Sequence, residues 1–308
     1  MYHAILSVKK QKERRRKRIA RSVLFLVCAA ILSFLIVQFF RLPSFQIKKI
    51  TVEGNKIIEG EKLKSIAQKD ISGKYLFLFP KSHIFLYPGE MIQNEIYAAF
   101  PRASSVNVSL KDGALVLSVK ERNPAALWCG KEKNILADDK CFYIDDTGYV
   151  FGESPVFSGS AYFKFYGQGM LKEGTPVGHV YISPSLFQKI FELRRMIEKY
   201  ERKMIDLLLL DESRAEFTAD SGCKIIFNTD QDFSSLRANM EAVFKSADWG
   251  KKLSGADKCA DLEYIDFRFG NKIYYKQKGL EPLPMNGTLD PNEKTVLLEN
   301  NAATTTAN

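Results

Sequence analysis

The strongest pattern in the chain is an apolar run near its amino terminus. Residues 22–40, SVLFLVCAAILSFLIVQFF, contain no charged side chain. At about 1.5 Å per residue, a helix of that length spans about 28 Å, which matches the ~30 Å hydrocarbon core of a bilayer. A cleaved signal peptide has a shorter apolar region followed by a small-x-small pattern, whereas this run ends in QFFR. The pattern predicts an uncleaved transmembrane helix at residues 22–40.

Apolar periodicity after residue 45 predicts a small α+β unit, residues 45–121. The expected order is strand, helix, helix, strand, strand: FQIKKITV, residues 58–68, residues 88–99 with Pro88 in the first turn, and alternating segments at 106–110 and 115–119. Gly54-Asn55 closes the first strand and Asp112-Gly113 joins the last two, because both pairs favour tight turns. Two amphipathic helices on one face of a three-stranded sheet would bury the apolar faces.

A second unit, residues 123–278, alternates between strand and helix patterns. Residues 186–197 and 233–247 carry apolar side chains at helical spacing. MIDLLLLDES is a continuous apolar run typical of a buried strand. Two hairpins are expected, one around Ser221-Gly222 and one in which LEYIDFRF and KIYYK flank Gly270-Asn271.

The two ends of the chain lie outside these units. Residues 1–21 carry nine Lys and Arg side chains and one acid, Glu13, so they hold +8 of the net charge of +9. Basic residues beside a span are retained in the cytoplasm, so this tail is expected there and the chain from Arg41 onward outside. Nucleic-acid binding by Arg14–Arg18 stays open, although attraction to anionic lipid explains the cluster more simply. Residues 279–308, ending in NNAATTTAN, are expected to be disordered.

Four cysteines lie outside the apolar run, at positions 129, 141, 223 and 259. In an oxidising exterior they can pair in three ways. Cys129 with Cys141 is favoured, because WCGKEKNILADDKC reads as a polar loop between two apolar strands, where a bridge would contribute roughly 3 kcal/mol. Four buried thiols are the alternative, since free cysteine packs as a small apolar side chain.

The sequence shows no catalytic pattern. Its histidines are His3, His83 and His179, and no nucleophile elbow, phosphate-binding glycine loop or HExxH motif is present. Ser183 lies near His179, but its place before a helix is typical of an N-cap. Asp138-Asp139 and Asp145-Asp146 lack the calcium-loop pattern, and both are interpreted as turn chemistry. We expect no enzyme and no catalytic, cofactor-binding or metal-binding residue, with a membrane-tethered hydrolase as the alternative.

Six segments, taken in order, resemble one family. They are FQIKKITVEGN at 45–55, GKYLF at 73–77, FPRASSVNV at 100–108, VKERNPAALW at 119–128, IDDTGYVF at 144–151 and YIDFRF at 264–269. Each is weak alone, but together, after a single amino-terminal span, they resemble the FtsQ/DivIB cell-division proteins over residues 22–277. The resemblance implies an α+β chain with a single transmembrane helix, a POTRA domain (β-α-α-β-β) at 45–121 and a mixed β-rich FtsQ-type domain at 123–278.

The same resemblance implies a non-enzymatic divisome scaffold in the cell (inner) membrane at the septum, which helps control septum formation. Its partners would be FtsB- and FtsL-like single-span proteins, other divisome components and the membrane, with no nucleic acid, no small-molecule substrate and no cofactor. The partner-binding strands of the family correspond here to Phe267, Arg268, Phe269, Lys272, Ile273, Tyr274, Tyr275 and Lys276.

These last strands are expected to have a core face and a contact face. The core face would hold Ile265, Phe267 and Phe269, which alternate. The contact face would hold Arg268, Tyr274 and Lys276, since Tyr and Arg are enriched in interfaces. An exposed strand edge recruits a strand from another chain through main-chain hydrogen bonds. The tail follows closely enough to cover that edge itself.

The runner-up is a POTRA-containing protein for polypeptide transport or envelope assembly. Such proteins usually repeat the unit and end in a barrel. This chain shows one copy, without the repeated segments of about ten residues that face lipid in a barrel.

Overall fold

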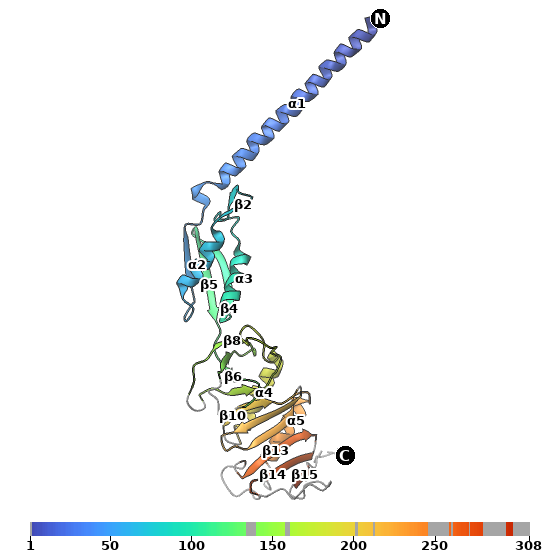
Figure 1. The fold of residues 1–308 in the computed structure, drawn as a ribbon. Helices are drawn as coiled ribbons and strands as arrows, with labels where there is room; N and C mark the ends of the chain where they lie inside the picture. Colours follow the sequence, from blue (N-terminus) through green and yellow to red (C-terminus); the bar gives the residue numbers. More distant parts are fainter. Residues whose placement is uncertain are drawn as a thin grey trace, which may run out of the picture. The chain divides into compact units, whose positions relative to one another are not determined.

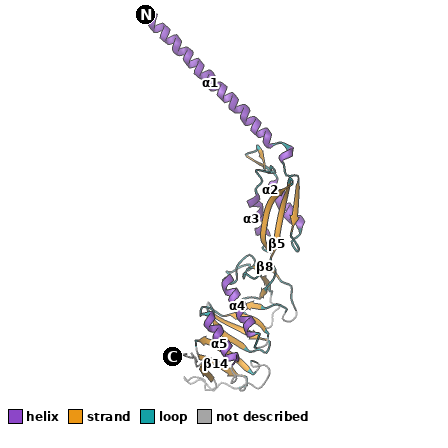
Figure 2. Cartoon of the chain, turned by 180° about the vertical axis from the view of Figure 1, so that it is seen from behind, coloured by secondary structure: helices purple, strands orange, loops and turns teal. Residues whose placement is uncertain are grey.

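The structure is a computed structural model in which the chain divides into two compact units. Unit 1 is Met1–Glu121 and unit 2 is Arg122–Asn308, and Figures 1 and 2 draw both. The described residues are 2–133, 140–157, 161–200, 203–211, 213–245, 259, 261–270, 272–279 and 294–297.

Unit 1 begins with α1, Tyr2–Phe40, a continuous helix. Within the described residues it is the one helix long and apolar enough to cross a membrane: the candidate span is Arg14–Phe40, and an 18-residue window in it has a mean hydropathy of 2.8. The helix starts well before the expected residue 22, because Lys and Arg are good helix formers and continue it through the basic tail. Most Leu and Phe side chains of the apolar run are exposed, Leu24, Phe25 and Phe34 among them, as they are in a helix surrounded by lipid.

In the part of the chain that the structure describes, the rest of unit 1 is a three-stranded sheet with two helices and a small hairpin. Its elements are η1 (Pro43–Phe45), β1 (Lys49–Glu53), α2 (Gly60–Ile71), β2 (Lys74–Tyr75), β3 (Phe79–Pro80), α3 (Gly89–Ala99), β4 (Ala103–Lys111) and β5 (Ala114–Glu121). The strand order is β1-β5-β4, with β1 parallel and β4 antiparallel to β5. The expected order of strands and helices is present, and the β2–β3 hairpin is an addition that the sequence pattern did not indicate.

Apolar side chains of α2 and α3 pack on one face of this sheet. The shared buried cluster includes Leu63 and Ala67 of α2, Ile92 and Ile96 of α3, and Leu115 and Leu117 of β5. Burying each Leu or Ile contributes about 1.5–3 kcal/mol, so this cluster fixes both helices on the sheet. The helix bounds differ slightly from the prediction. α2 runs from Gly60 to Ile71, and Pro88 precedes α3 instead of lying in its first turn.

The turn after β1 is held in place by close contacts and hydrogen bonds with the end of β5. Gly54 has a φ of +82°, and a Cβ there would lie 2.4 Å from the carbonyl oxygen of Val119, so only glycine fits. The Glu121 carboxylate accepts hydrogen bonds from three consecutive backbone amides, those of Lys56, Ile57 and Ile58. Burial raises the pKa of Glu121, but these bonds outweigh burial and lower it overall. The prediction that Gly54 is a structural turn residue is confirmed.

In its described residues, unit 2 contains a ten-stranded mixed sheet and two helices. Its elements are β6 (Ala126–Trp128), β7 (Phe142–Ile144), β8 (Val150–Glu153), β9 (Lys164–Tyr166), α4 (Pro184–Ile197), β10 (Met204–Leu209), β11 (Arg214–Ala219), β12 (Lys224–Asn228), α5 (Phe233–Lys245), β13 (Leu262–Phe269), β14 (Lys272–Gln277) and β15 (Lys294–Leu297). The sheet order is β15-β14-β13-β12-β11-β10-β9-β6-β7-β8. The pairs β12–β13, β9–β10 and β6–β9 are parallel.

Helices α4 and α5 pack on one face of this sheet (Figure 2). Phe187 of α4 stacks on Phe165 of β9 with ring centroids 5.6 Å apart, and Phe244 of α5 lies 6.2 Å from Phe267 of β13. Ser183 precedes α4, and its hydroxyl oxygen accepts a hydrogen bond from a backbone amide of the first turn. The predicted N-cap is confirmed.

Two disulfides cross-link unit 2. One joins Cys129 to Cys141, the pair that the polar loop favoured. The other joins Cys223, just before β12, to Cys259, just before β13. The sequence did not single out this second pair, because its two cysteines are 36 residues apart and meet only through the pairing of β12 with β13. Both ends of the second bridge are fully buried.

Asp145 organises the turn between β7 and β8. Its carboxylate accepts hydrogen bonds from the backbone amides of Thr147 and Tyr149, from the Thr147 hydroxyl and from Arg122. Burial raises the pKa of Asp145, but the bonds from Thr147 and Arg122 outweigh it and lower the pKa. Gly148 follows with a φ of +80°, where a Cβ would lie 2.4 Å from the carbonyl oxygen of Ile182. The interpretation of Asp145 as turn chemistry is confirmed, while Asp138-Asp139 lies outside the described residues.

Candidate partner-docking edge

The eight predicted partner-binding residues lie together on the last hairpin of unit 2. β13 carries Phe267, Arg268 and Phe269, and β14 carries Lys272, Ile273, Tyr274, Tyr275 and Lys276. The strands are antiparallel, with Asp266 opposite Tyr274. Gly270 turns the chain between them with a φ of +64°, and Asn271, the other half of the expected turn, lies outside the described residues.

One side of this hairpin belongs to the core. Phe267, Ile273 and Tyr275 are at most 4% exposed, and Phe244 of α5 packs on Phe267. Burial raises the pKa of Tyr275, so its hydroxyl stays neutral at physiological pH. These side chains hold β13 and β14 in the core, and a partner that approaches from outside does not reach them.

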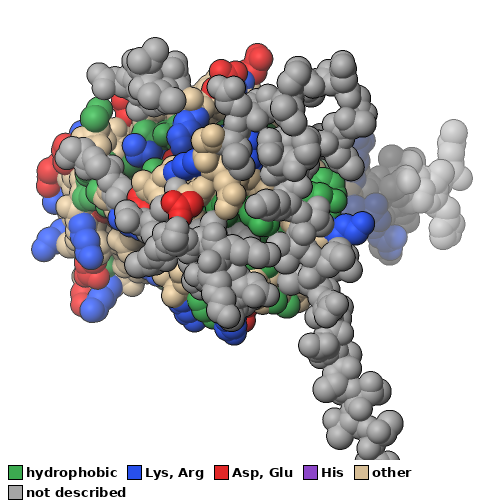
Figure 3. All heavy atoms as spheres, turned by 90° about the horizontal axis from the view of Figure 1, so that it is seen from below, with side chains coloured by type: hydrophobic (Ala, Val, Ile, Leu, Met, Phe, Trp, Pro, Cys, Tyr) green, Lys and Arg blue, Asp and Glu red, His purple; other side chains and the backbone are tan. Residues whose placement is uncertain are grey.

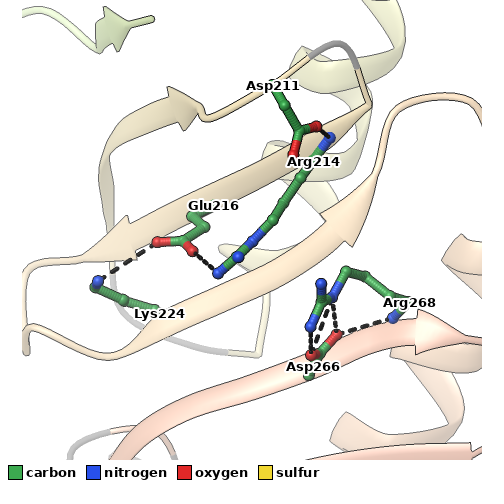
Figure 4. A network of polar contacts seen from close by, with 6 residues as sticks. All are labelled: Asp211, Arg214, Glu216, Lys224, Asp266 and Arg268. Carbon is green, nitrogen blue, oxygen red and sulfur yellow. Dashed lines mark hydrogen bonds and ion pairs between the residues drawn. The ribbon is translucent and has the colours of Figure 1, made fainter. Parts of the chain in front are cut away.

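On the other side of the hairpin, Arg268 and Lys276 are already paired with carboxylates, and Figure 4 shows the pair at Arg268. Arg268 donates to both carboxylate oxygens of Asp266, over 2.9 Å and 2.6 Å, and this bonding raises the pKa of the guanidinium. The Nζ atom of Lys276 lies 3.0 Å from a carboxylate oxygen of Glu263. A partner would therefore meet fixed ion pairs at Arg268 and Lys276, which give geometric specificity more than net charge.

Neighbouring strands continue the polar face. Glu216 of β11 accepts a 2.6 Å hydrogen bond from Arg214 and lies 3.4 Å from Lys224 of β12. Glu216 and Asp266 are both about nine-tenths buried or more, and such carboxylates are tolerated only when paired. In the space-filling view of Figure 3 the described acidic and basic side chains lie interspersed. Sequence reasoning missed this network, although the alternation within YIDFRF already set Asp266 apart from its apolar neighbours.

Phe269 departs from the prediction. It was expected in the core with Ile265 and Phe267, but it is 52% exposed. The register of β13 and β14 shifts between Asp266 and Phe269, so the strict alternation ends before Phe269 and its ring points outward. The ring makes an edge-to-face contact with Tyr274, with centroids 5.1 Å apart. Of the features of the hairpin, this aromatic pair most resembles the contact sites of protein interfaces, in which aromatic side chains are enriched.

The chain itself occupies the edge of β14. β15 runs antiparallel to β14, with Ile273 opposite Val296 and Tyr274 opposite Thr295. The prediction of a disordered tail is therefore wrong at Lys294–Leu297, while residues 280–293 and 298–308 lie outside the described part of the chain. An unpaired strand edge can be extended by a further strand. Thr295 and Val296 are β-branched and favour the extended backbone of such a strand. That dipeptide is the sequence signal that could have indicated β15.

No protein-family model matches this chain, and no curated protein matches it. Among the described residues, no group of three or more His, Cys, Asp or Glu side chains is placed to hold a metal ion. The described residues of the hairpin do show the pairing of β14 with β15 and the contact between Phe269 and Tyr274.

Proposed function

We propose that this chain is a membrane-anchored, non-enzymatic scaffold of the cell-division machinery, of the FtsQ/DivIB type. α1 anchors it in the cell membrane with the basic tail in the cytoplasm, and units 1 and 2 lie outside as a POTRA domain and an FtsQ-type domain. The scaffold gathers FtsB- and FtsL-like single-span proteins and helps control septum formation. The ordered resemblance of six sequence segments supports this proposal, as does an amino-terminal helix long enough to cross a membrane.

The pairing of β14 with β15 carries the docking part of the proposal. The edge of β14 already accepts an antiparallel strand over four register positions, from Lys272 to Tyr275. A partner strand takes the place of β15, so that main-chain hydrogen bonds supply affinity. The exposed ring of Phe269, in contact with the half-buried ring of Tyr274, supplies a side-chain contact beside that ladder. Aromatic side chains of this kind often dominate the energy of an interface.

Depletion of the protein tests the proposed function. Cells that lose it are expected to elongate without septa, and a fluorescently tagged copy is expected to concentrate at the division site. Partners copurified from native membranes with the full-length protein should include single-span coiled-coil proteins. Normal septation together with an evenly spread tagged copy would rule out the division role.

Two substitutions test the docking edge in the same copurification. Tyr274→Glu places a charge beside the ladder and Ile273→Pro removes a backbone donor. Each is expected to weaken partner capture about tenfold, which corresponds to roughly 1.4 kcal/mol. Val156→Glu is the matched control, because Val156 is 79% exposed and follows β8, at the other end of the sheet. If both variants fold and capture partners as the unaltered chain does, β14 is not the docking edge.

A further inference from the structure

The β2–β3 hairpin presents large apolar side chains to its surroundings. Leu76 and Phe77, at its tip, are 81% and 92% exposed. Phe85, a few residues after the hairpin, is 72% exposed. Contiguous apolar groups of this size mark contact with a membrane or with another protein.

The backbone of the tip makes these side chains unusual. Leu76 and Phe77 both have positive φ, +47° and +61°, and the amide of Leu78 closes the turn by donating to the carbonyl oxygen of Tyr75 over 3.0 Å. A turn with two positive φ angles is ordinarily built from Asn, Asp or Gly, because a bulky side chain is strained there. Neither the turn nor water therefore favours Leu and Phe at the tip, which points to an apolar environment around it.

The base of the hairpin packs against the end of α1. The Phe40 ring, last in the apolar helix, lies 5.3 Å from the Phe79 ring of β3 and 4.8 Å from the ring of His83. The segment after the hairpin is also tied to the segment after α1, since the amide of Ile84 donates to the carbonyl oxygen of Phe45 over 2.9 Å. Both Figures 1 and 2 show the hairpin beside the end of α1. The tip thus belongs to the part of unit 1 nearest the membrane-crossing helix.

The charges around the hairpin suit a lipid surface. Residues 72–89 contain no acidic side chain, and Lys74 and Lys81 flank the tip. Lys81 lies over the ring of Tyr75, 5.4 Å from its centroid. Lys side chains attract anionic headgroups, and Tyr is enriched at the boundary between headgroups and acyl chains. An apolar tip flanked by Lys and Tyr is the composition of an interfacial anchor.

We propose that the β2–β3 hairpin inserts Leu76 and Phe77 into the leaflet at which α1 ends, as a second point of membrane attachment for unit 1. At about 3.3 Å per residue, the tip can reach about 10 Å beyond Phe79, which packs on the end of α1. That reach is comparable to the depth of about 5–10 Å to which interfacial segments enter the boundary between headgroups and acyl chains. Phe85, whose ring lies 5.6 Å from the ring of His83, is a further exposed apolar side chain of this part of unit 1. This inference rests on α1 spanning the bilayer and is independent of the division role.

Tryptophan reporters in the full-length protein, reconstituted into phosphatidylcholine–phosphatidylglycerol vesicles, test the insertion. The reporter variant is Phe77→Trp. Its signal is the tryptophan fluorescence that remains after the emission of the unsubstituted chain is subtracted. Ile57→Trp is the matched control, because Ile57 is 68% exposed in the same unit but follows the far end of β1. Phe34→Trp, within α1, reports whether the helix itself is in the bilayer.

The expected result is that vesicles with brominated acyl chains quench Phe77→Trp at least about twofold, while aqueous iodide quenches it weakly. Ile57→Trp should respond to iodide and not to bromine. Quenching of Phe77→Trp by iodide alone overturns the proposal, and so does protection from both quenchers, which would mean that protein covers the tip. If Phe34→Trp escapes bromine quenching, α1 does not span and the proposal fails for that reason. None of these readings depends on a division partner.

Discussion

At the scale of single residues, Asp145 shows how one carboxylate holds a turn together. It is 4% exposed and receives four hydrogen bonds, one of them from Arg122, whose side chain is only 19% exposed. Removing the charge leaves these donors facing an amide and Arg122 without its ion pair. Asp145→Asn is therefore expected to lower the free energy of unfolding by about 1–3 kcal/mol at neutral pH. Urea unfolding of the detergent-solubilised protein measures the loss, and the exposed neighbour in Asp146→Asn is the control.

The same carboxylate predicts a dependence on acid. The pKa of Asp145 is lower in the folded chain than its ordinary value of 3.8, so its charged form stabilises the fold. That contribution is complete above 3.8 and is lost as the pH falls through the lower folded value. The unaltered protein should lose more stability than Asp145→Asn does as the pH falls below 3.8. Parallel losses in both proteins across that range would contradict this role for Asp145.

At the scale of elements, β15 competes with any strand that docks on β14. Deletion of residues 280–308 removes β15 and opens the ladder opposite Ile273 and Tyr274. The truncated protein is expected to bind its partner roughly tenfold more tightly, because the partner no longer has to displace β15. A tenfold change corresponds to about 1.4 kcal/mol of lost pairing between β14 and β15. Titration of a labelled partner ectodomain against both proteins measures the change. Equal affinities would mean that the partner binds elsewhere or adds to the outer edge of β15.

At the scale of the whole molecule, the charge of the amino-terminal tail sets the expected orientation. Nine basic residues lie in residues 1–21, and the remainder of the chain carries a net charge of only +1. Replacing all nine with glutamine should invert a measurable share of the chains, because basic residues near a span are held in the cytoplasm. Protease protection of units 1 and 2 in sealed vesicles measures that share. Lys111→Gln with Lys120→Gln, remote from the span, should leave orientation unchanged, and an unaltered orientation in the nine-residue variant would contradict the prediction.

The sequence by itself determined the features that local patterns control. The uncharged run gave the apolar helix α1, helical spacing gave α2 to α5, and the requirement for positive φ marked Gly54. Local periodicity reports which side of an element is apolar, and turn residues report where the chain reverses, so both can be read from neighbouring positions.

Only the tertiary structure decided what depends on distant parts of the chain. Strand register turned Phe269 outward, pairing with β14 ordered Lys294–Leu297, and the approach of β12 to β13 joined Cys223 to Cys259. The exposure of Leu76 and Phe77 also follows from how the hairpin packs. The sequence of an apolar segment does not reveal whether its side chains are buried or exposed. Register and pairing are set by contacts across the sheet, which periodicity along one strand does not contain.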